Sequence, residues 1–185
     1  MKHWHINHSV RVVKNGGVLA YPTEAVYGLG CSPYCSSAVM KILSLKRRDI
    51  VKGMILVGSD ISQFDLLVDI DGLPRKDEIL ANWPGPVTWI LPAKTGVPYW
   101  LRGNNQGLAV RISNHPDVRQ LCKKAGILVS TSANPSGCRP AREARRVRAY
   151  FGDALDYILP GSVGQLAAPT EIRDAVSGKI LRSNS

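Results

Sequence analysis

Residues 108–137 read LAVRISNHPDVRQLCKKAGILVSTSANPSG, and they set the expectation for the fold. Residues 108–113 and 127–131 are short apolar runs, which are typical of buried strands. Residues 116–125, between them, are expected to form a helix that Asn114 caps. A strand, a helix and a second strand in succession indicate an α/β protein with a sheet covered by helices.

The same alternation continues on both sides of this stretch. Further helices are expected over residues 7–14, 36–46, 73–83 and 142–151. Further strands are expected over residues 18–21, 53–58, 87–91, 157–159, 171–174 and 179–181. Several connections are too short for a helical crossover, so we expect a mixed sheet rather than a wholly parallel one.

Composition places the chain among globular proteins. With 185 residues, 44% of them hydrophobic, the chain is long enough for one core without disulfide or metal cross-links. Its apolar runs are far shorter than the roughly 20 residues that span a bilayer. The leading segment MKHWHINHSV lacks the apolar centre of a secretory signal. We therefore expect a cytoplasmic protein that has no membrane contact.

The metal-ligating residue types do not form a known ligand pattern. Four cysteines occur without a C-x-x-C pair, which indicates reduced thiols that bind no metal. His3, His5 and His8 form a small cluster that either binds a metal ion or belongs to a solvated leading segment. No metal site is therefore expected from the protein's own residues.

The chain is strongly basic. It has 24 lysines and arginines against 14 aspartates and glutamates, a formal net charge of +10 at pH 7. This excess favours polyanionic partners such as nucleotides, nucleic acids or anionic lipid. The phosphate loop G-x-x-x-x-G-K-[ST] and a strand-following G-x-G-x-x-G are both missing. A nucleotide site would therefore be assembled from scattered charged and polar residues.

The end of the helix over residues 36–46 is a candidate anion site. Lys46 continues the apolar stripe of this helix, and a lysine on the inward side needs an anion or an opening. If the chain straightens there, Lys46 and Arg48 point the same way and form a phosphate clamp. The alternative is a basic run that complements the helix C-terminus.

Residues 128–137 continue a strand into a polar turn. Alternation places Ser130, Ser132 and Asn134 on one side, provided that the chain stays extended as far as Pro135. Hydroxyls and an amide at the end of a buried strand are typical of ligand sites in open α/β sheets. The alternative is an ordinary polar turn.

Arginine is prominent at two other places. Arg111 shares its strand face with the small residues Ala109 and Ser113, an arrangement that suits carboxylate or phosphate recognition, or else a solvated face. Five arginines fall within residues 139–148, and the basic helix that they predict either tracks an RNA backbone or is simply solvated. Direct binding of tRNA or double-stranded RNA is therefore a hypothesis.

Five short segments together carry a family resemblance. They are YPTEAVYGLG (21–30), KRR (46–48), WPGPVT (83–88), AVR (109–111) and STSANPSG (130–137). In this order they resemble the YrdC/TsaC family, whose members are threonylcarbamoyl-adenylate synthases, and the likeness covers about residues 9–182. It implies one domain over residues 1–185, similar to the short bacterial members. The implied fold is an open, twisted mixed sheet flanked by helices, with a basic concave face.

The resemblance also implies a reaction and a set of site residues. ATP, L-threonine and bicarbonate would give L-threonylcarbamoyladenylate and pyrophosphate, with Mg²⁺ accompanying ATP. A separate transferase complex would then use the adenylate to modify the tRNA adenosine beside the anticodon. The implied catalytic residues are Lys46, Arg48, Ser132 and Asn134. ATP would be bound by these four together with Lys52 and Arg182. Threonine would be bound by Thr23, Arg111, Ser130 and Thr170.

The chain departs from the family at a few positions, all in or near the implied threonine pocket. Ala25 stands where many relatives have threonine, Val57 replaces a histidine of longer members, and Thr170 lies near a Ser-Thr pair of some relatives. A third reading is a related carbamoyl-adenylate role in the maturation of a metal centre. Family members with that role are usually embedded in much longer chains.

Overall fold

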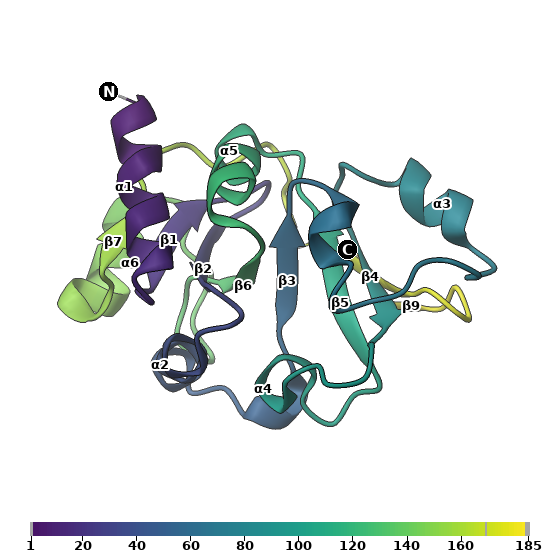
Figure 1. The fold of residues 1–185 in the computed structure, drawn as a ribbon. Coiled ribbons are helices and arrows are strands. Elements are labelled where there is room, and N and C mark those ends of the chain that lie inside the picture. The colour runs from purple at the N-terminus through teal and green to yellow at the C-terminus, as the bar shows by residue number, and fades with distance from the viewer. Residues whose placement is uncertain (1, 169, 184–185) are drawn as a thin grey trace.

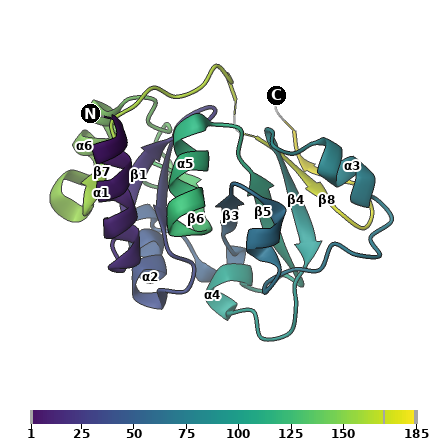
Figure 2. The ribbon, with the colours of Figure 1, turned by 45° about the horizontal axis from the view of Figure 1, so that its top comes forward.

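The computed structural model describes residues 2–168 and 170–183. These residues form one open nine-stranded sheet with helices on both faces (Figures 1 and 2). The strands are β1 (Leu19–Pro22), β2 (Tyr27–Cys31), β3 (Ile55–Gly58), β4 (Val87–Pro92), β5 (Gly107–Ile112), β6 (Leu128–Ser132), β7 (Tyr157–Ile158), β8 (Glu171–Asp174) and β9 (Ile180–Arg182). The α-helices are α1 (Lys2–Lys14), α2 (Ser36–Lys46), α3 (Lys76–Ala81), α4 (Tyr99–Arg102), α5 (Pro116–Ala125) and α6 (Ala144–Phe151). The 3₁₀ helices are η1 (Ile50–Lys52), η2 (Ile61–Phe64) and η3 (Gly152–Ala154).

The sheet is mixed. Its strand order is β7-β1-β2-β6-β3-β5-β4-β8-β9. The pairs β1–β7, β3–β5 and β4–β8 are parallel, and the other neighbours are antiparallel. The prediction of an α/β protein with an open mixed sheet flanked by helices is therefore confirmed.

Helices α1 and α5 lie side by side over one face of the sheet (Figures 1 and 2). Ile6 and Val10 of α1 and Leu121 of α5 pack against Tyr21 of β1 and Leu128 of β6. The spacing of four residues between Ile6 and Val10 puts both on one side of α1. Burying each such aliphatic side chain contributes about 1.5–3 kcal/mol.

Helices α2 and α6 belong to the core on the opposite face. Val39 and Ile42 of α2 and Val147 of α6 belong to the same cluster as Ala20 and Leu29. Ala20 follows Leu19 and precedes Tyr21, so the two-residue period of β1 sends it to the other side of the sheet. The strands in the centre are thus buried on both faces.

The predicted elements agree with the structure best where one local signal is strong. Helices α2 and α5 and strand β8 have the predicted bounds. The helices expected over 73–83 and 142–151 are shorter, and α1 begins earlier than expected. Asn114 does not cap α5, because Pro116 occupies the first turn and His115 is the capping residue, without a side-chain bond.

Strand β2 and helix α4 were not predicted. The glycines of β2 lower its strand propensity, yet the strand is central and fully buried. A Cβ added at Gly30 would lie 2.6 Å from Cε1 of Tyr21 and 2.8 Å from the carbonyl oxygen of Val129. Glycine is therefore required there by close packing, which the local sequence pattern does not reveal.

Other predictions concern the thiols, the histidines and the membrane. All four cysteines are free. Nδ1 of His5 lies 2.6 Å from the Tyr157 hydroxyl, and the His8 ring stacks on Trp4. Within residues 2–168 and 170–183, no three histidine, cysteine or acidic side chains are grouped as metal ligands. None of the helices described is both long and apolar enough to cross a bilayer.

Candidate active site

The sheet face under α1 and α5 continues into a cavity of about 480 Å³. Leu128, Ser130 and Ser132 alternate on one side of β6: Leu128 packs beneath the two helices, while both serines line the cavity. Gly28 of β2 and Ala109 of β5 line the cavity as well. Because these side chains are small, the strands leave room for a ligand.

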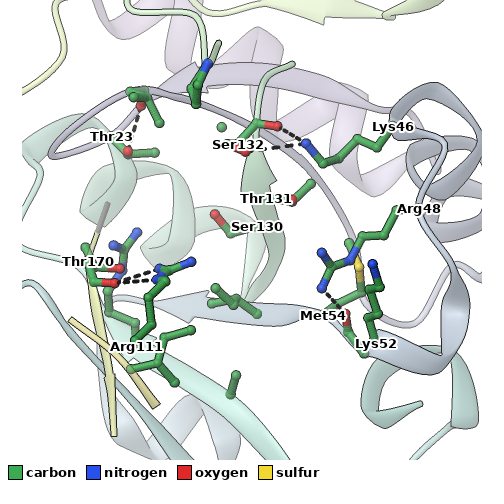
Figure 3. A pocket seen from close by; sticks show the side chains of 18 of the residues that line it. Thr23, Lys46, Arg48, Lys52, Met54, Arg111, Ser130, Thr131, Ser132 and Thr170 are labelled. Atoms are coloured by element: carbon green, nitrogen blue, oxygen red, sulfur yellow. Dashed lines mark hydrogen bonds between the residues drawn. The ribbon is translucent and has the colours of Figure 1, made fainter. Parts of the chain in front are cut away.

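All of the site residues predicted from the sequence line this one cavity. They are Thr23, Lys46, Arg48, Lys52, Arg111, Ser130, Ser132, Asn134, Thr170 and Arg182. Figure 3 shows Lys46, Arg48 and Lys52 on one side and Arg111 and Thr170 on the other. The structure thus brings the residues together, while the role of each stays a prediction.

Helix α2 ends in a left-handed residue. Arg47 has φ 51° and ψ 47°, and the N–H of Arg48 donates to the carbonyl of Leu43 at 2.9 Å. Such a turn satisfies the free carbonyls at a helix C-terminus and is more often made by glycine. The condition that the chain straightens after Lys46 is therefore not met. Lys46 and Arg48 nevertheless both line the cavity, as does Arg47.

The ammonium group of Lys46 is surrounded by oxygen atoms. Its Nζ lies 2.5 Å from the carbonyl oxygen of Ser132 and 2.9 Å from that of Asn134 (Figure 3 shows the Ser132 side). The side-chain oxygens of the same two residues lie at 3.4 Å. Burial, assisted by the positive charge of Arg48, lowers the pKa of Lys46 to about 8. These contacts fasten the end of α2 to the turn after β6.

Arg48 and Lys52 belong to the segment that follows α2. Nη2 of Arg48 donates to the carbonyl oxygen of Gly53 at 3.0 Å, and burial lowers the pKa of Arg48. Asp49 caps η1 by accepting from the N–H of Val51 at 3.0 Å. Lys52 ends η1 and is exposed at the cavity.

Two polar residues of the cavity lie outside the segments that the sequence analysis singled out. Arg102, at the end of α4, and Asn105, just after it, both line the cavity. The N–H of Met54 donates to the carbonyl of Leu101 at 2.8 Å, which holds α4 beside η1. No local pattern identifies these two residues, because contacts between distant segments bring α4 to the cavity.

The turn after β6 is bent rather than extended. Strand β6 ends at Ser132, and the N–H of Asn134 donates back to the carbonyl of Ser132 at 3.0 Å. The side-chain amide of Asn134 donates through its Nδ2 to the carbonyls of Pro135 and Cys138. The extended geometry assumed as far as Pro135 is therefore wrong, although Ser130, Ser132 and Asn134 all line the cavity as predicted.

Arg111 forms a buried ion pair. Its Nη2 lies 3.3 Å from Oε2 of Glu24, and the two residues are only 6% and 8% exposed. Oε1 of Glu24 accepts from the hydroxyl of Ser113 at 2.7 Å and from the N–H of Asn114 at 3.1 Å. The alternative of a solvated strand face for Arg111 is therefore wrong. Glu24 was not among the predicted site residues, because its partners lie far along the chain.

Thr23 and Thr170 are buried at the cavity wall. The hydroxyl of Thr23 donates to the carbonyl of Val26 at 2.7 Å and closes the turn between β1 and β2. The hydroxyls of Thr170 and the buried Thr88 lie 3.4 Å apart. The guanidinium of Arg182 donates twice to the carbonyl of Thr170, at 3.1 and 2.6 Å. Residues of β4 and β9 thus support Thr170.

The family departures fall in different places. Ala25 is buried and lines the cavity, so the change from threonine affects the cavity directly. Val57 packs in the core beneath α1 and α5. The missing histidine of longer members therefore concerns that core.

The cavity is suited to a polyanion. Seven basic side chains line it: Lys46, Arg47, Arg48, Lys52, Arg102, Arg111 and Arg182. Among the lining residues described, there is no aspartate or glutamate. Partial desolvation, together with the like charges of Arg111 and Arg48, lowers the pKa of Arg182. Opposing charge on a ligand would relieve this repulsion. The wider basic concave face stays a prediction.

The family follows from a comparison with known proteins. The family model Sua5_yciO_yrdC, described as telomere recombination, matches residues 11–184. The chain belongs to the Sua5/YciO/YrdC family. The resemblance seen in the five sequence segments is thereby confirmed.

Relatives in the Sua5/YciO/YrdC family are similar over nearly their whole length. A protein of Stenotrophomonas maltophilia is 50% identical over 186 residues, 99% of this chain and 100% of its own. A protein of Hahella chejuensis is 49% identical over 183 residues, which cover 98% of this chain and 100% of that protein. Both are named threonylcarbamoyl-AMP synthase.

Solved structures of the Sua5/YciO/YrdC family share the fold. Sua5 of P. abyssi in complex with L-threonine has a TM-score of 0.89 and 28% identity, with 98% of this chain and 54% of that chain covered. YciO of E. coli has a TM-score of 0.81 at 24% identity, with 99% and 92% covered, which shows the fold alone.

Proposed function

We propose that the protein is a threonylcarbamoyl-AMP synthase that forms L-threonylcarbamoyladenylate and pyrophosphate from ATP, L-threonine and bicarbonate. The observation that carries the proposal is the convergence of Lys46 and Arg48 with Ser132 and Asn134 on one cavity rich in cations. Relatives with this name match nearly the whole length of the chain, which supports the same reaction.

The proposed chemistry has two steps. The threonine amine first attacks bicarbonate, and loss of water gives N-carboxythreonine. The new carboxylate then attacks the α-phosphorus of ATP, and the bond from that phosphorus to the bridging oxygen breaks to release pyrophosphate. No side chain need become covalently attached, so catalysis consists of positioning and of stabilising negative charge.

We assign the residues by their chemistry and place. Lys46, Arg48, Lys52 and Arg182 would bind the phosphates, because charge-assisted bonds to phosphate oxygens are strong. Ser132 and Asn134 would orient the nucleotide from the turn after β6. Thr23, Arg111, Ser130 and Thr170 would hold threonine, with Arg111 on its carboxylate.

Magnesium is expected to enter with ATP. The lining residues described offer hydroxyls and amides but no carboxylate, so phosphate oxygens would be the main ligands of the ion. Bound Mg²⁺ would neutralise part of the phosphate charge.

A coupled assay tests the proposal. The protein is incubated with ATP, Mg²⁺, bicarbonate and L-threonine in the presence of pyrophosphatase, and AMP and phosphate are measured. Release that requires both threonine and bicarbonate is the expected result. Release that does not respond to threonine would refute the proposed reaction.

The proposed product serves tRNA modification. A mixed carboxylic–phosphoric anhydride is an activated acyl donor, so a separate transferase complex would carry its threonylcarbamoyl group to the adenosine beside the anticodon. We place the protein in the cytoplasm, where tRNA is modified. The alternative role in metal-centre maturation has less support, because relatives named threonylcarbamoyl-AMP synthase match this chain over nearly its whole length.

Direct RNA binding is a second candidate function. All five arginines of residues 139–148 are exposed, on α6 and the segment before it. Arg146 stacks over the ring of Tyr150 at 4.8 Å, and Arg145 pairs with Glu143. The packing side of α6 is formed by buried Val147 and Phe151, which leaves the arginines facing outward. This surface is suited to a phosphate backbone.

Substitution of Arg142, Arg145 and Arg146 by glutamine tests RNA binding. We expect weaker binding of tRNA and a shallower dependence of affinity on salt, with a slope smaller by about one for each lost phosphate contact. Substitution of the exposed Lys123 and Lys124 by glutamine is the control. Equal affinities in both variants would contradict the assignment.

A further inference from the structure

Glu24 belongs to the turn that joins β1 to β2, and its side chain is held by several segments. Oε1 accepts hydrogen bonds from the Ser113 hydroxyl and the Asn114 N–H, and Oε2 pairs with Arg111. The carbonyl of Glu24 also accepts from the N–H of Leu166 at 3.1 Å. The carboxylate is therefore fixed before any ligand is present.

The network behind the carboxylate continues through Ser113. The hydroxyl of Ser113 donates to Glu24 and accepts from the N–H of His115 at 3.1 Å. Nε2 of His115 lies 3.1 Å from the carbonyl of Ser162. Ser113 and His115 are themselves buried, so this support is shielded from water.

The pair with Glu24 leaves Arg111 with donors to spare. Nε of Arg111 is buried and has no hydrogen-bond partner among the described residues. Arg111 lines the cavity, whereas Glu24 is not among the lining residues described. The contact with Glu24 is an ion pair at Nη2 alone, and a planar guanidinium held at one nitrogen presents its other nitrogens in a defined direction. The free donors of Arg111 are thus suited to an anionic ligand in the cavity.

The charge of Glu24 is maintained by its surroundings. Burial alone raises the pKa of this carboxyl, but the charge of Arg111 and the bonds from Ser113 and Asn114 outweigh it and lower the pKa below its ordinary value. Glu24 is therefore ionised at neutral pH. It balances the Arg111 charge within a cavity where other cations already repel one another.

We propose that Glu24 is a positioning residue, which holds the Arg111 guanidinium in the orientation that binds the carboxylate of threonine. This inference rests on the proposed function and deepens it. Glu24 acts through Arg111 and does not itself touch the substrate.

Glu24→Gln tests the inference because it keeps the size of the side chain and removes its charge. We expect the KM for threonine to rise about tenfold or more, the change expected on loss of a charge-assisted hydrogen bond, with the KM for ATP nearly unchanged. Calorimetry with L-threonine alone should show the same loss of affinity. Glu143→Gln, which removes an exposed carboxylate paired with Arg145, is the matched control.

A double-mutant cycle separates positioning from simple stabilisation. In the Arg111→Met background, Glu24→Gln should not weaken threonine binding further, because the residue through which it acts is gone. It should instead raise the melting temperature, because an unpaired buried carboxylate is removed. Additive losses of threonine affinity, or equal rises in both KM values, would overturn the inference.

Two further measurements keep the test decisive. If Glu24→Gln does not fold, Ser113→Ala removes one bond to the carboxylate and should give the same selective loss in smaller measure; unchanged threonine affinity would overturn the inference. A wild-type protein that binds threonine but releases no threonine-dependent pyrophosphate would refute the proposed reaction and leave the Glu24 test intact. A wild-type protein that binds no threonine would refute both the proposed reaction and the role of Glu24.

Discussion

Lys46 carries a charge where charge is costly. It is 6% exposed, and its ammonium is held by backbone oxygens of the turn after β6. These oxygens stabilise the ammonium only in part, since its pKa is still lowered to about 8. A phosphate group beside it would add the missing negative charge. Its position therefore favours an ATP-binding role over mere complementation of the helix end.

Lys46→Met should abolish most activity. By analogy with the loss of a single oxyanion donor, we expect about 3–4 kcal/mol less transition-state stabilisation, or roughly a 10²–10³-fold fall in kcat. Threonine-dependent pyrophosphate release measures it. Lys123→Met, on the exposed side of α5, is the control and should retain full activity. Normal activity of the Lys46→Met variant would refute a role for Lys46 in the reaction.

The pH dependence of activity and stability should have opposite signs. Activity should fall as pH rises through about 8, because Lys46 loses its charge. Stability should show the reverse. Since the folded pKa is below the usual 10.5, the unfolded chain binds more protons between these values, and this group's contribution to stability rises with pH.

Urea unfolding and kcat/KM for ATP, each measured between about pH 7 and pH 10, test this expectation. In Lys46→Met, the part of each pH dependence that Lys46 causes should disappear. A parallel loss of stability and activity in the wild-type protein would instead indicate alkaline unfolding.

At the residue scale, the sequence predicted the site through its motifs rather than through its geometry. Lys46 and Asn134 were identified correctly as cavity residues, although the extended chain assumed at each is absent. Glu24 and Arg102 were missed, because their importance depends on contacts with segments far along the chain. Pairing across such distances has no local signature.

At the scale of elements, β2 shows how close packing restricts the sequence. A Cβ at Gly30 would lie 2.6 Å from the Tyr21 ring, whereas a Cβ at Gly28 would lie 3.2 Å from Thr23, 3.4 Å from the Tyr21 ring and 3.6 Å from the Ser130 hydroxyl. Gly30 thus serves the packing of the sheet, and Gly28 serves the width of the cavity.

Gly30→Ala and Gly28→Ala should therefore differ. We expect Gly30→Ala to destabilise the protein by about 1–3 kcal/mol through overpacking, and Gly28→Ala to cost less. Gly28→Ala should instead weaken substrate binding, because its methyl group enters the cavity. Denaturant unfolding and KM values measure the two effects. Equal destabilisation by both would contradict the separation.

The bounds of elements were predicted well where one signal dominates. The apolar stripe and last-turn lysine of α2, and the proline and glycine that flank α5, mark both ends of these helices. Strand β2 was missed because glycine has a low strand propensity. Its glycine at position 30 is required by close packing against the ring of Tyr21. Helix α4 is a single turn held by contacts with η1, so no periodicity reveals it.

At the scale of the whole molecule, ligand binding and folding are linked. Mg²⁺·ATP at about one hundred times its dissociation constant should raise the unfolding free energy by about 2.7 kcal/mol. For a chain of this size the melting temperature should rise by about 5–10 °C. The shift should be much smaller in Lys46→Met and unchanged in Lys123→Met. An equal shift in all three proteins would show that ATP binds elsewhere.

Contributions to the cavity come from both ends of the described chain: Thr23 follows β1, and Arg182 ends β9. During translation, a nascent polypeptide still lacking residues 180–182 has no guanidinium to hold the carbonyl of Thr170, and its cavity has one cation fewer. The cavity is therefore complete only when nearly all of the described residues have been synthesised.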